Sequence, residues 1–128
     1  MLNVFLSMRT KGLNFMEALA KRECIMSDFL RQYDKYKNDI VFIDSLNENY
    51  VEGESNPIEF LGKSIITMKD ADIALIPVDY KKSHGCKCEY TVAVEYDIPI
   101  RSYIYSKNGT WFFDGFLEFI EREDDNAK

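Results

Sequence analysis

The chain has 128 residues, of which 46% are hydrophobic and 30% charged, and its formal net charge is −6. This length fits one domain, and the acidic balance argues against duplex nucleic acid as a partner, because duplex binding relies on a basic face. No apolar run approaches the roughly 20 residues that span a bilayer, and no signal-peptide pattern opens the chain, so we expect no membrane partner. Three cysteines predict no disulfide framework and favour a reducing, cytoplasmic location.

Buried strands and amphipathic stretches alternate in the first half of the chain. Residues 2–6 predict a short buried strand, because strands of a covered parallel sheet are continuous apolar runs. A polar loop with a glycine follows at 7–12, and apolar residues at helical spacing predict a long helix over 15–30. A second buried strand is predicted at 40–43, followed by a long polar loop over 44–56.

The second half of the chain continues this alternation. The predicted elements are a helix over 57–68 with proline in its first turn, a strand over 73–78, a polar loop over 79–87, a helix marked by 90–94, a strand over 98–105, a helix over 112–120, and a charged, frayed tail over about 121–128. The alternation predicts a single α/β domain over 1–128, with a four- to five-stranded parallel sheet covered on both faces.

Two polar loops follow the first and third predicted strands, and ligands in open α/β sheets bind at the carboxyl ends of such strands. The first loop carries Ser7, Arg9 and Gly12 just before a helix. Free backbone N–H groups at a helix start, with a bidentate arginine, favour an anion site. The alternative is a solvated turn with charged side chains.

The second loop contains Gly85, which lets the backbone approach a ligand closely, and it ends at Glu89. Glu89 is either a first-turn carboxylate stabilised by the helix dipole or a nucleophile at the mouth of the sheet. His84, Cys86 and Cys88 lack the spacing of a metal knuckle, so we predict no metal and no cofactor. Trp111 and the nearby phenylalanines are predicted to form core or an oligomer contact.

Four sequence segments in order carry a family resemblance: Val4-Phe5-Leu6-Ser7-Met8-Arg9, Asp70-Ala71-Asp72-Ile73-Ala74-Leu75-Ile76, Ser83-x-Gly85-x-x-x-Glu89-x-x-x-Ala93 and Ile98-Pro99. Over roughly residues 2 to 105 they resemble the nucleoside 2-deoxyribosyltransferase superfamily. Phe60-Leu61-Gly62-Lys63-Ser64, with the Gly85–Glu89 region, also resembles small phage and bacterial members whose function is undefined. The resemblance implies a flavodoxin-like, Rossmann-like three-layer sandwich. It also implies N-glycosidic cleavage, in which Glu89 attacks the anomeric carbon of the sugar as the nucleophile of a retaining glycosidase does.

The resemblance also implies a substrate class. Ser83 matches the branch that hydrolyses 2-deoxynucleoside 5′-monophosphates, and Ser7 and Arg9 match the phosphate ligands of that branch. Ser64 stands where the family carries an aspartate that assists the leaving base or positions the sugar, and a serine hydroxyl cannot replace a carboxyl group as proton donor. Candidate sugar or base contacts are therefore Asp44, Glu59, Ser64 and Asp79.

Three functions remain open from the sequence. The first is an N-glycosidase of a deoxynucleoside 5′-monophosphate, or a 2-deoxyribosyl transferase. The second is a binding protein for a nucleotide or a nucleotide-derived signal, which a phage could use against host defence in the host cytoplasm. The third is an interaction module that kept only the fold. The expected partners are a small-molecule nucleotide and, because family members are commonly dimers, a second copy that contacts residues 110–119.

Overall fold

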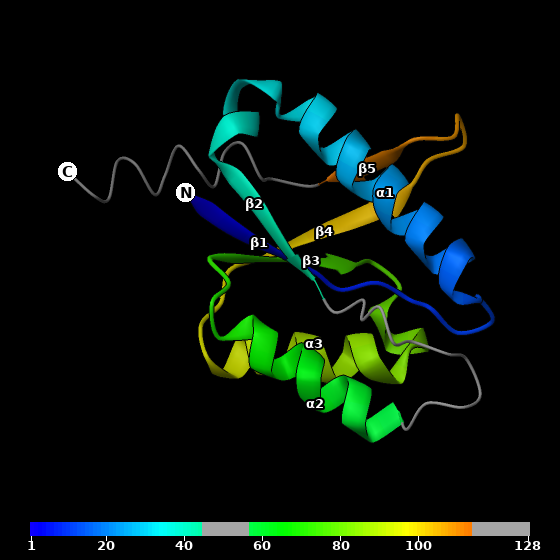
Figure 1. The fold of residues 1–128 in the computed structure, drawn as a ribbon, viewed down its shortest axis with the longest axis vertical. Helices are drawn as coiled ribbons and strands as arrows, with labels where there is room; N and C mark the ends of the chain where they lie inside the picture. Colours follow the sequence, from blue (N-terminus) through cyan, green and yellow to red (C-terminus); the bar gives the residue numbers. More distant parts are fainter. Residues whose placement is uncertain (45–56, 114–128) are drawn as a thin grey trace.

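The computed structural model describes residues 1–44 and 57–113, and within them one sheet has the strand order β2-β1-β3-β4-β5 (Figure 1). The strands are β1 (Leu2–Leu6), β2 (Ile40–Asp44), β3 (Ile73–Pro77), β4 (Ile100–Tyr105) and β5 (Trp111–Phe113), and the α-helices are α1 (Phe15–Gln32), α2 (Pro57–Met68) and α3 (His84–Glu95). Short 3-10 helices cover Asp34–Asp39 and Tyr80–Lys82. The predicted α/β fold in this part of the chain is confirmed.

The first four strands pair in parallel, and β5 pairs antiparallel with β4. The sheet is therefore mixed rather than fully parallel. From β1 the chain moves outward to β2 and then returns to the other side of β1 for β3, so the strand order reverses between β1 and β3. The carboxyl ends of these two strands form the edge at which a ligand is expected.

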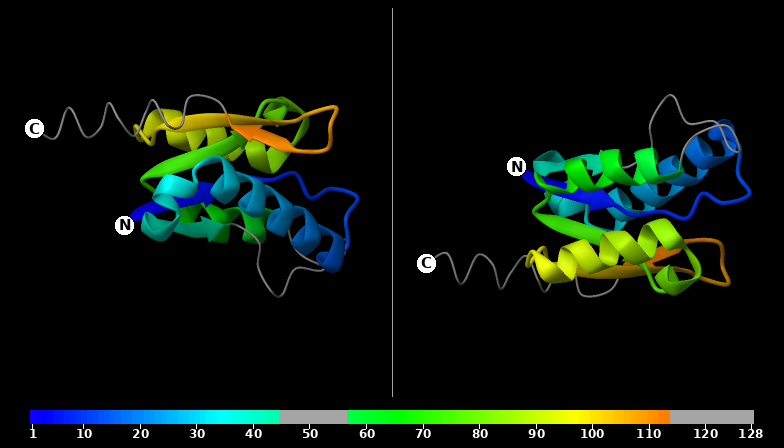
Figure 2. Two further views of the ribbon diagram at one scale, coloured as in Figure 1. Left: turned by 90° about the horizontal axis from the view of Figure 1, so that it is seen from above. Right: turned by 90° about the horizontal axis from the view of Figure 1, so that it is seen from below.

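Helices cover both faces of the sheet: α1 lies on one face, and α2 and α3 lie on the other (Figures 1 and 2). Side chains alternate between the faces along each strand. Val4 and Leu6 of β1 pack in the same cluster as α1, whereas Phe5 packs with Met68 of α2 and Ala93 of α3. Each face thus has its own core.

The core beneath α1 is rich in aromatic rings. The centroid of the Phe29 ring lies 5.0 Å from that of Tyr33, 5.5 Å from that of Phe42 and 5.0 Å from that of Phe113. The core beneath α2 and α3 is built from smaller side chains together with Phe5 and Met68. Phe113 is buried, so its core interpretation is confirmed. Trp111 packs against the α1 cluster but is only partly buried, and Phe112 is exposed.

A capping box stabilises the start of α1, which lies at the predicted boundary. The Asn14 side chain accepts a hydrogen bond from the Glu17 backbone N–H at 2.9 Å, and the Glu17 carboxylate accepts one from the Asn14 N–H at 3.0 Å. Gly12 precedes this cap with φ +85°, a left-handed conformation that favours glycine. The polar loop after β1 therefore ends in a fixed turn.

Two predicted boundaries are wrong. The third helix begins at His84 rather than near Tyr90, because the Ser83 side chain accepts from the Cys86 N–H at 3.3 Å and caps the helix earlier. Residues 112 and 113, predicted to begin a helix, belong instead to strand β5, because a turn at Gly109, with φ +89°, reverses the chain and pairs Tyr105 with Trp111.

The remainder of that predicted helix, the tail and residues 45–56 of the predicted loop lie outside the described residues. Within residues 1–44 and 57–113, no helix combines the length and apolar character that crossing a membrane requires.

Candidate functional site

Glu89 lies in the second turn of α3 and is only 4% exposed. It shares the buried stripe of the helix with Cys86 and Ala93, at helical spacing. The interpretation of Glu89 as a first-turn carboxylate stabilised by the helix dipole is therefore wrong. A glutamate buried on an apolar helix face needs hydrogen-bond partners, because burial of an unpaired carboxylate is costly.

Two serine hydroxyls supply these partners. The Ser7 hydroxyl donates to Glu89 Oε1 at 2.6 Å, and the Ser64 hydroxyl donates to Glu89 Oε2. Ser7 directly follows β1, and Ser64 lies on α2, one turn before the buried Met68. Strand, helix α2 and helix α3 therefore bring three predicted site residues together at the carboxyl end of β1.

Burial dominates the electrostatics of this group. Desolvation raises the pKa of Glu89, and the hydrogen bonds from Ser64 and Ser7 oppose the rise by stabilising the ionised carboxylate. The Cys86 thiol lies beside the same group. Burial raises the pKa of Cys86, the hydroxyls of Ser7 and Ser83 lower it, and the charge of Glu89 raises it.

Arg9 and Asp79 form a second group at the same edge of the sheet. Their side chains make an ion pair and line a cavity of about 430 Å³. The other lining residues are Lys21, Pro77, Val78, Tyr103, Ile104, Tyr105 and Trp111. Neither Glu89 nor Ser64 lines this cavity, although the charge of Glu89 contributes to the raised pKa of Tyr103, which does line it.

Tyr103 connects the two groups. Tyr103 lines the cavity, and its buried hydroxyl donates to the backbone oxygen of Ser7 at 2.6 Å. Burial raises the pKa of Tyr103 well above its ordinary value, so the hydroxyl keeps the proton that it donates. The Ser7 side chain in turn contacts Glu89.

The remaining predicted site residues make no hydrogen bond to Glu89 among the described residues. Ser83 caps α3, and Gly85 follows in the first turn, where an added Cβ would meet no atom within 4 Å. Glu59 is on α2 with its side chain 68% exposed, and its carboxylate lies 3.8 Å from Lys63 Nζ. Asp44 ends β2 opposite Leu6, and its side chain lies outside what the structure describes.

Sequence reasoning missed Lys21, Tyr103 and Tyr105 as possible site residues, and it gave Trp111 only a core or oligomer role. The signal is weak, because these residues come from α1, β4 and β5 and meet only through the sheet topology. Across the described part of the chain, no group of three or more histidine, cysteine, aspartate or glutamate residues is arranged to hold a metal ion.

Comparisons of this chain with protein-family models, with curated proteins and with solved structures find no match. The class of the protein is therefore defined by its fold and its site. The protein is an α/β protein with a buried, serine-bound glutamate at the point where the strand order reverses. Such a carboxylate can act as a nucleophile, as a proton acceptor or as a fixed hydrogen-bond acceptor.

Proposed function

We propose that this protein has a flavodoxin-like fold and cleaves the N-glycosidic bond of a 2-deoxynucleoside 5′-monophosphate, with Glu89 as the nucleophile. One observation carries the proposal: the buried Glu89 carboxylate is held by the hydroxyls of Ser7 and Ser64 beside the carboxyl end of β1. The strand order 2-1-3-4-5 is that of flavodoxin-like sheets, whose ligands bind between the first and third strands. The motif resemblance supports the same reaction.

The proposed reaction has two steps. A carboxylate oxygen of Glu89 forms a bond to the anomeric carbon, and the base leaves with the electron pair of the carbon–nitrogen bond. Water then attacks the sugar ester, releases deoxyribose 5-phosphate and restores the carboxylate. If a second base attacks in place of water, the same intermediate gives 2-deoxyribosyl transfer.

The two serine hydroxyls have defined roles in this proposal. They stabilise the ionised form of Glu89 and fix the direction of its oxygens. Ser64 does not protonate the leaving base, because a serine hydroxyl is not an acid at neutral pH. The base takes its proton from solvent, which makes cleavage slower than in an enzyme with a carboxyl group at this position.

We propose that the phosphate binds at the start of α3. The first turn of this helix presents backbone N–H groups beside Ser83, and Gly85 leaves open space there. Arg9 joins this site only by exchanging its ion pair with Asp79 for the phosphate. A free nucleoside lacks the group that these donors recognise.

Chromatography of free base tests the reaction. The protein is incubated with each 2-deoxynucleoside 5′-monophosphate, beside Glu89→Gln and the control Glu95→Gln, which changes an exposed glutamate on the same helix. We expect base release by the unchanged protein and by the control, and none by Glu89→Gln. Equal release by all three proteins rejects Glu89 as the nucleophile.

A second candidate function is nucleotide binding without turnover. It is favoured by the full engagement of Glu89, whose two oxygens both accept serine hydroxyls and whose side chain is almost inaccessible. This function predicts a rise in melting temperature with nucleotide and no free base. Absence of any shift with millimolar nucleotide rejects it.

A further inference from the structure

The cavity beside α1 has the dimensions of a small-molecule site. Its volume of about 430 Å³ lies within the range of ligand pockets. Its walls come from α1, from the ends of β3 and β4, and from β5. Tyr103 and Trp111 pack in the core beneath α1, so the cavity lies on that side of the sheet, away from Ser64 on α2.

The charged residues of the cavity are two cations and one anion. Arg9 pairs with Asp79, and Lys21 donates to the backbone oxygen of Arg9 at 3.0 Å. Desolvation and the charge of Arg9 both lower the pKa of Lys21. The cavity thus concentrates positive charge in a protein whose formal net charge is −6, and an anion placed between the two cations relieves their repulsion.

Three aromatic rings line the same cavity. The Trp111 ring centroid lies 4.8 Å from that of Tyr105 and 5.4 Å from that of Tyr103, in both cases edge to face. Lys21 Nζ lies 5.8 Å from the centre of the Trp111 ring. One cation and one large ring therefore lie within the span of a single small ligand.

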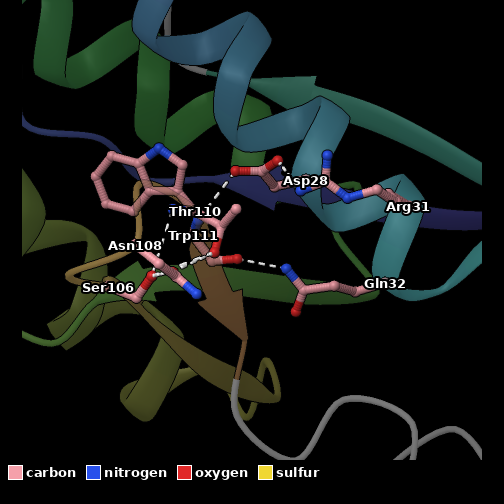
Figure 3. Close-up of polar contacts among 7 residues, drawn as sticks. All are labelled: Asp28, Arg31, Gln32, Ser106, Asn108, Thr110 and Trp111. Atoms are coloured by element: carbon pink, nitrogen blue, oxygen red, sulfur yellow. Dashed lines mark hydrogen bonds and ion pairs between the residues drawn. The ribbon is translucent and has the colours of Figure 1, made fainter.

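Side chains of α1 fix the position of Trp111 (Figure 3). Asp28 accepts a hydrogen bond from the backbone N–H of Trp111 at 2.9 Å, and Gln32 donates one to the Trp111 carbonyl oxygen. In the turn that precedes β5, the hydroxyl of Ser106 lies 3.3 Å from the Thr110 backbone nitrogen and accepts its hydrogen bond. Because backbone and turn are both held, the aromatic wall is formed before any ligand arrives.

We infer that this cavity binds a small ligand that carries a planar ring and a terminal anionic group, with the ring against Trp111 and Tyr105 and the anion on Lys21 and Arg9. The inference goes beyond the proposed function: it shares Arg9 with the proposed phosphate site but uses neither Glu89 nor Ser64. The anion is a phosphate or a carboxylate, both of which match the guanidinium fork of arginine. Asp79 competes with the ligand for Arg9, so its removal strengthens binding.

Fluorescence of Trp111, the single tryptophan of the chain, provides the measurement. Four probes separate the contributions: adenosine 5′-monophosphate carries ring and phosphate, benzoate carries ring and carboxylate, adenosine lacks the anion, and inorganic phosphate lacks the ring. We expect saturable quenching by the nucleotide or by benzoate, and the tighter of the two identifies the anion. Adenosine and inorganic phosphate bind at least about tenfold more weakly.

Substitutions then assign the contacts. We expect Lys21→Met to weaken binding by about tenfold and Asp79→Asn to strengthen it severalfold. Lys35→Met is the control, since Lys35 is an exposed lysine whose Nζ also lies near a ring, 5.5 Å from the centre of Tyr36. Circular dichroism confirms that each variant is folded.

Three results overturn the inference: no quenching by either ring-bearing anion up to about 10 mM, equal affinity for adenosine and its monophosphate, or equal affinity in Lys21→Met and Lys35→Met. The titration is repeated in Glu89→Gln. Binding that survives there while base release is lost supports the cavity independently of the reaction. Base release without any quenching rejects the cavity and leaves the proposed function standing.

Discussion

Replacing Ser64 by alanine tests the central hydrogen bond of the site. Ser64 and Glu89 are each only 4% exposed, so water does not replace the lost hydroxyl. A hydrogen bond to a charged group contributes about 1.5–3 kcal/mol, and one to a neutral group about 0.5–1.5 kcal/mol. We therefore expect Ser64→Ala to lower the free energy of unfolding by about 0.5–1.5 kcal/mol while Glu89 is protonated, and by about 1.5–3 kcal/mol at a pH high enough to ionise Glu89. At roughly 4 °C per kcal/mol, the larger loss lowers the melting temperature by about 6–12 °C.

The loss depends on pH in a defined direction. The folded-state pKa of Glu89 is raised by burial, so the folded protein holds its proton more tightly than the unfolded chain does. Its contribution to stability is complete below the unfolded pKa and is lost as pH rises through the folded pKa. Without the Ser64 hydroxyl the folded pKa of Glu89 rises further, so the cost of the substitution in unfolding free energy grows as pH rises.

Urea denaturation at several pH values measures this cost. Thr67→Ala is the matched control, because Thr67 lies on the same helix and its hydroxyl donates only to the Lys63 backbone oxygen, at 3.1 Å, in an exposed position. We expect the control to change stability by less than about 0.5 kcal/mol. A cost of Ser64→Ala that equals the control, or that is the same at every pH, refutes the hydrogen-bonded, ionised carboxylate.

Three further predictions follow from the same geometry. Glu89→Gln removes the titrating group, so the free energy of unfolding of the variant, relative to that of the unchanged protein, increases as pH rises above the pKa of Glu89 in the unfolded chain. Urea denaturation at several pH values measures this difference, and a difference that stays constant between acidic and neutral pH contradicts the prediction. Asn14→Ala breaks the capping box with Glu17 and lowers the free energy of unfolding by about 1 kcal/mol, measured by urea denaturation; no change argues against the cap. Tyr103→Phe removes the hydrogen bond to the Ser7 oxygen and lowers the free energy of unfolding by about 1 kcal/mol, and a neutral effect in urea denaturation argues against that bond.

Local patterns predicted most of the fold. Continuous apolar runs placed β1, β2 and β3, and helical spacing placed α1 and α2, because each of these elements buries one face against the sheet. The short strand β5 escaped prediction. Trp111-Phe112-Phe113 fits a helix as well as a strand, and its pairing with β4 depends on a turn that the pattern of apolar residues does not encode.

The sequence predicted those contacts of the site that follow from the order of strands and helices alone. Ser7 follows the carboxyl end of β1, and Glu89 lies on the helix that follows β3, the strand beside β1. The sheet topology therefore brings the two residues together, as predicted from the order of the loops. The direct bond from Ser64 was not foreseeable, since it depends on how α2 rotates against α3. The pairing of Arg9 with Asp79 likewise depends on side-chain directions that spacing leaves undetermined.

The unequal cores on the two faces of the sheet have a consequence for motion. Phe29 and its ring neighbours hold α1 through large apolar contacts, whereas α2 and α3 pack on smaller side chains and enclose the polar pair Ser64 and Glu89. Local opening occurs where apolar contacts are fewest. Backbone amides of α2 and α3 are therefore expected to exchange with deuterium before those of α1. Faster exchange in α2 and α3 would indicate that the layer carrying Glu89 opens while α1 stays packed on the sheet, and such opening would give a ligand a route to the buried carboxylate.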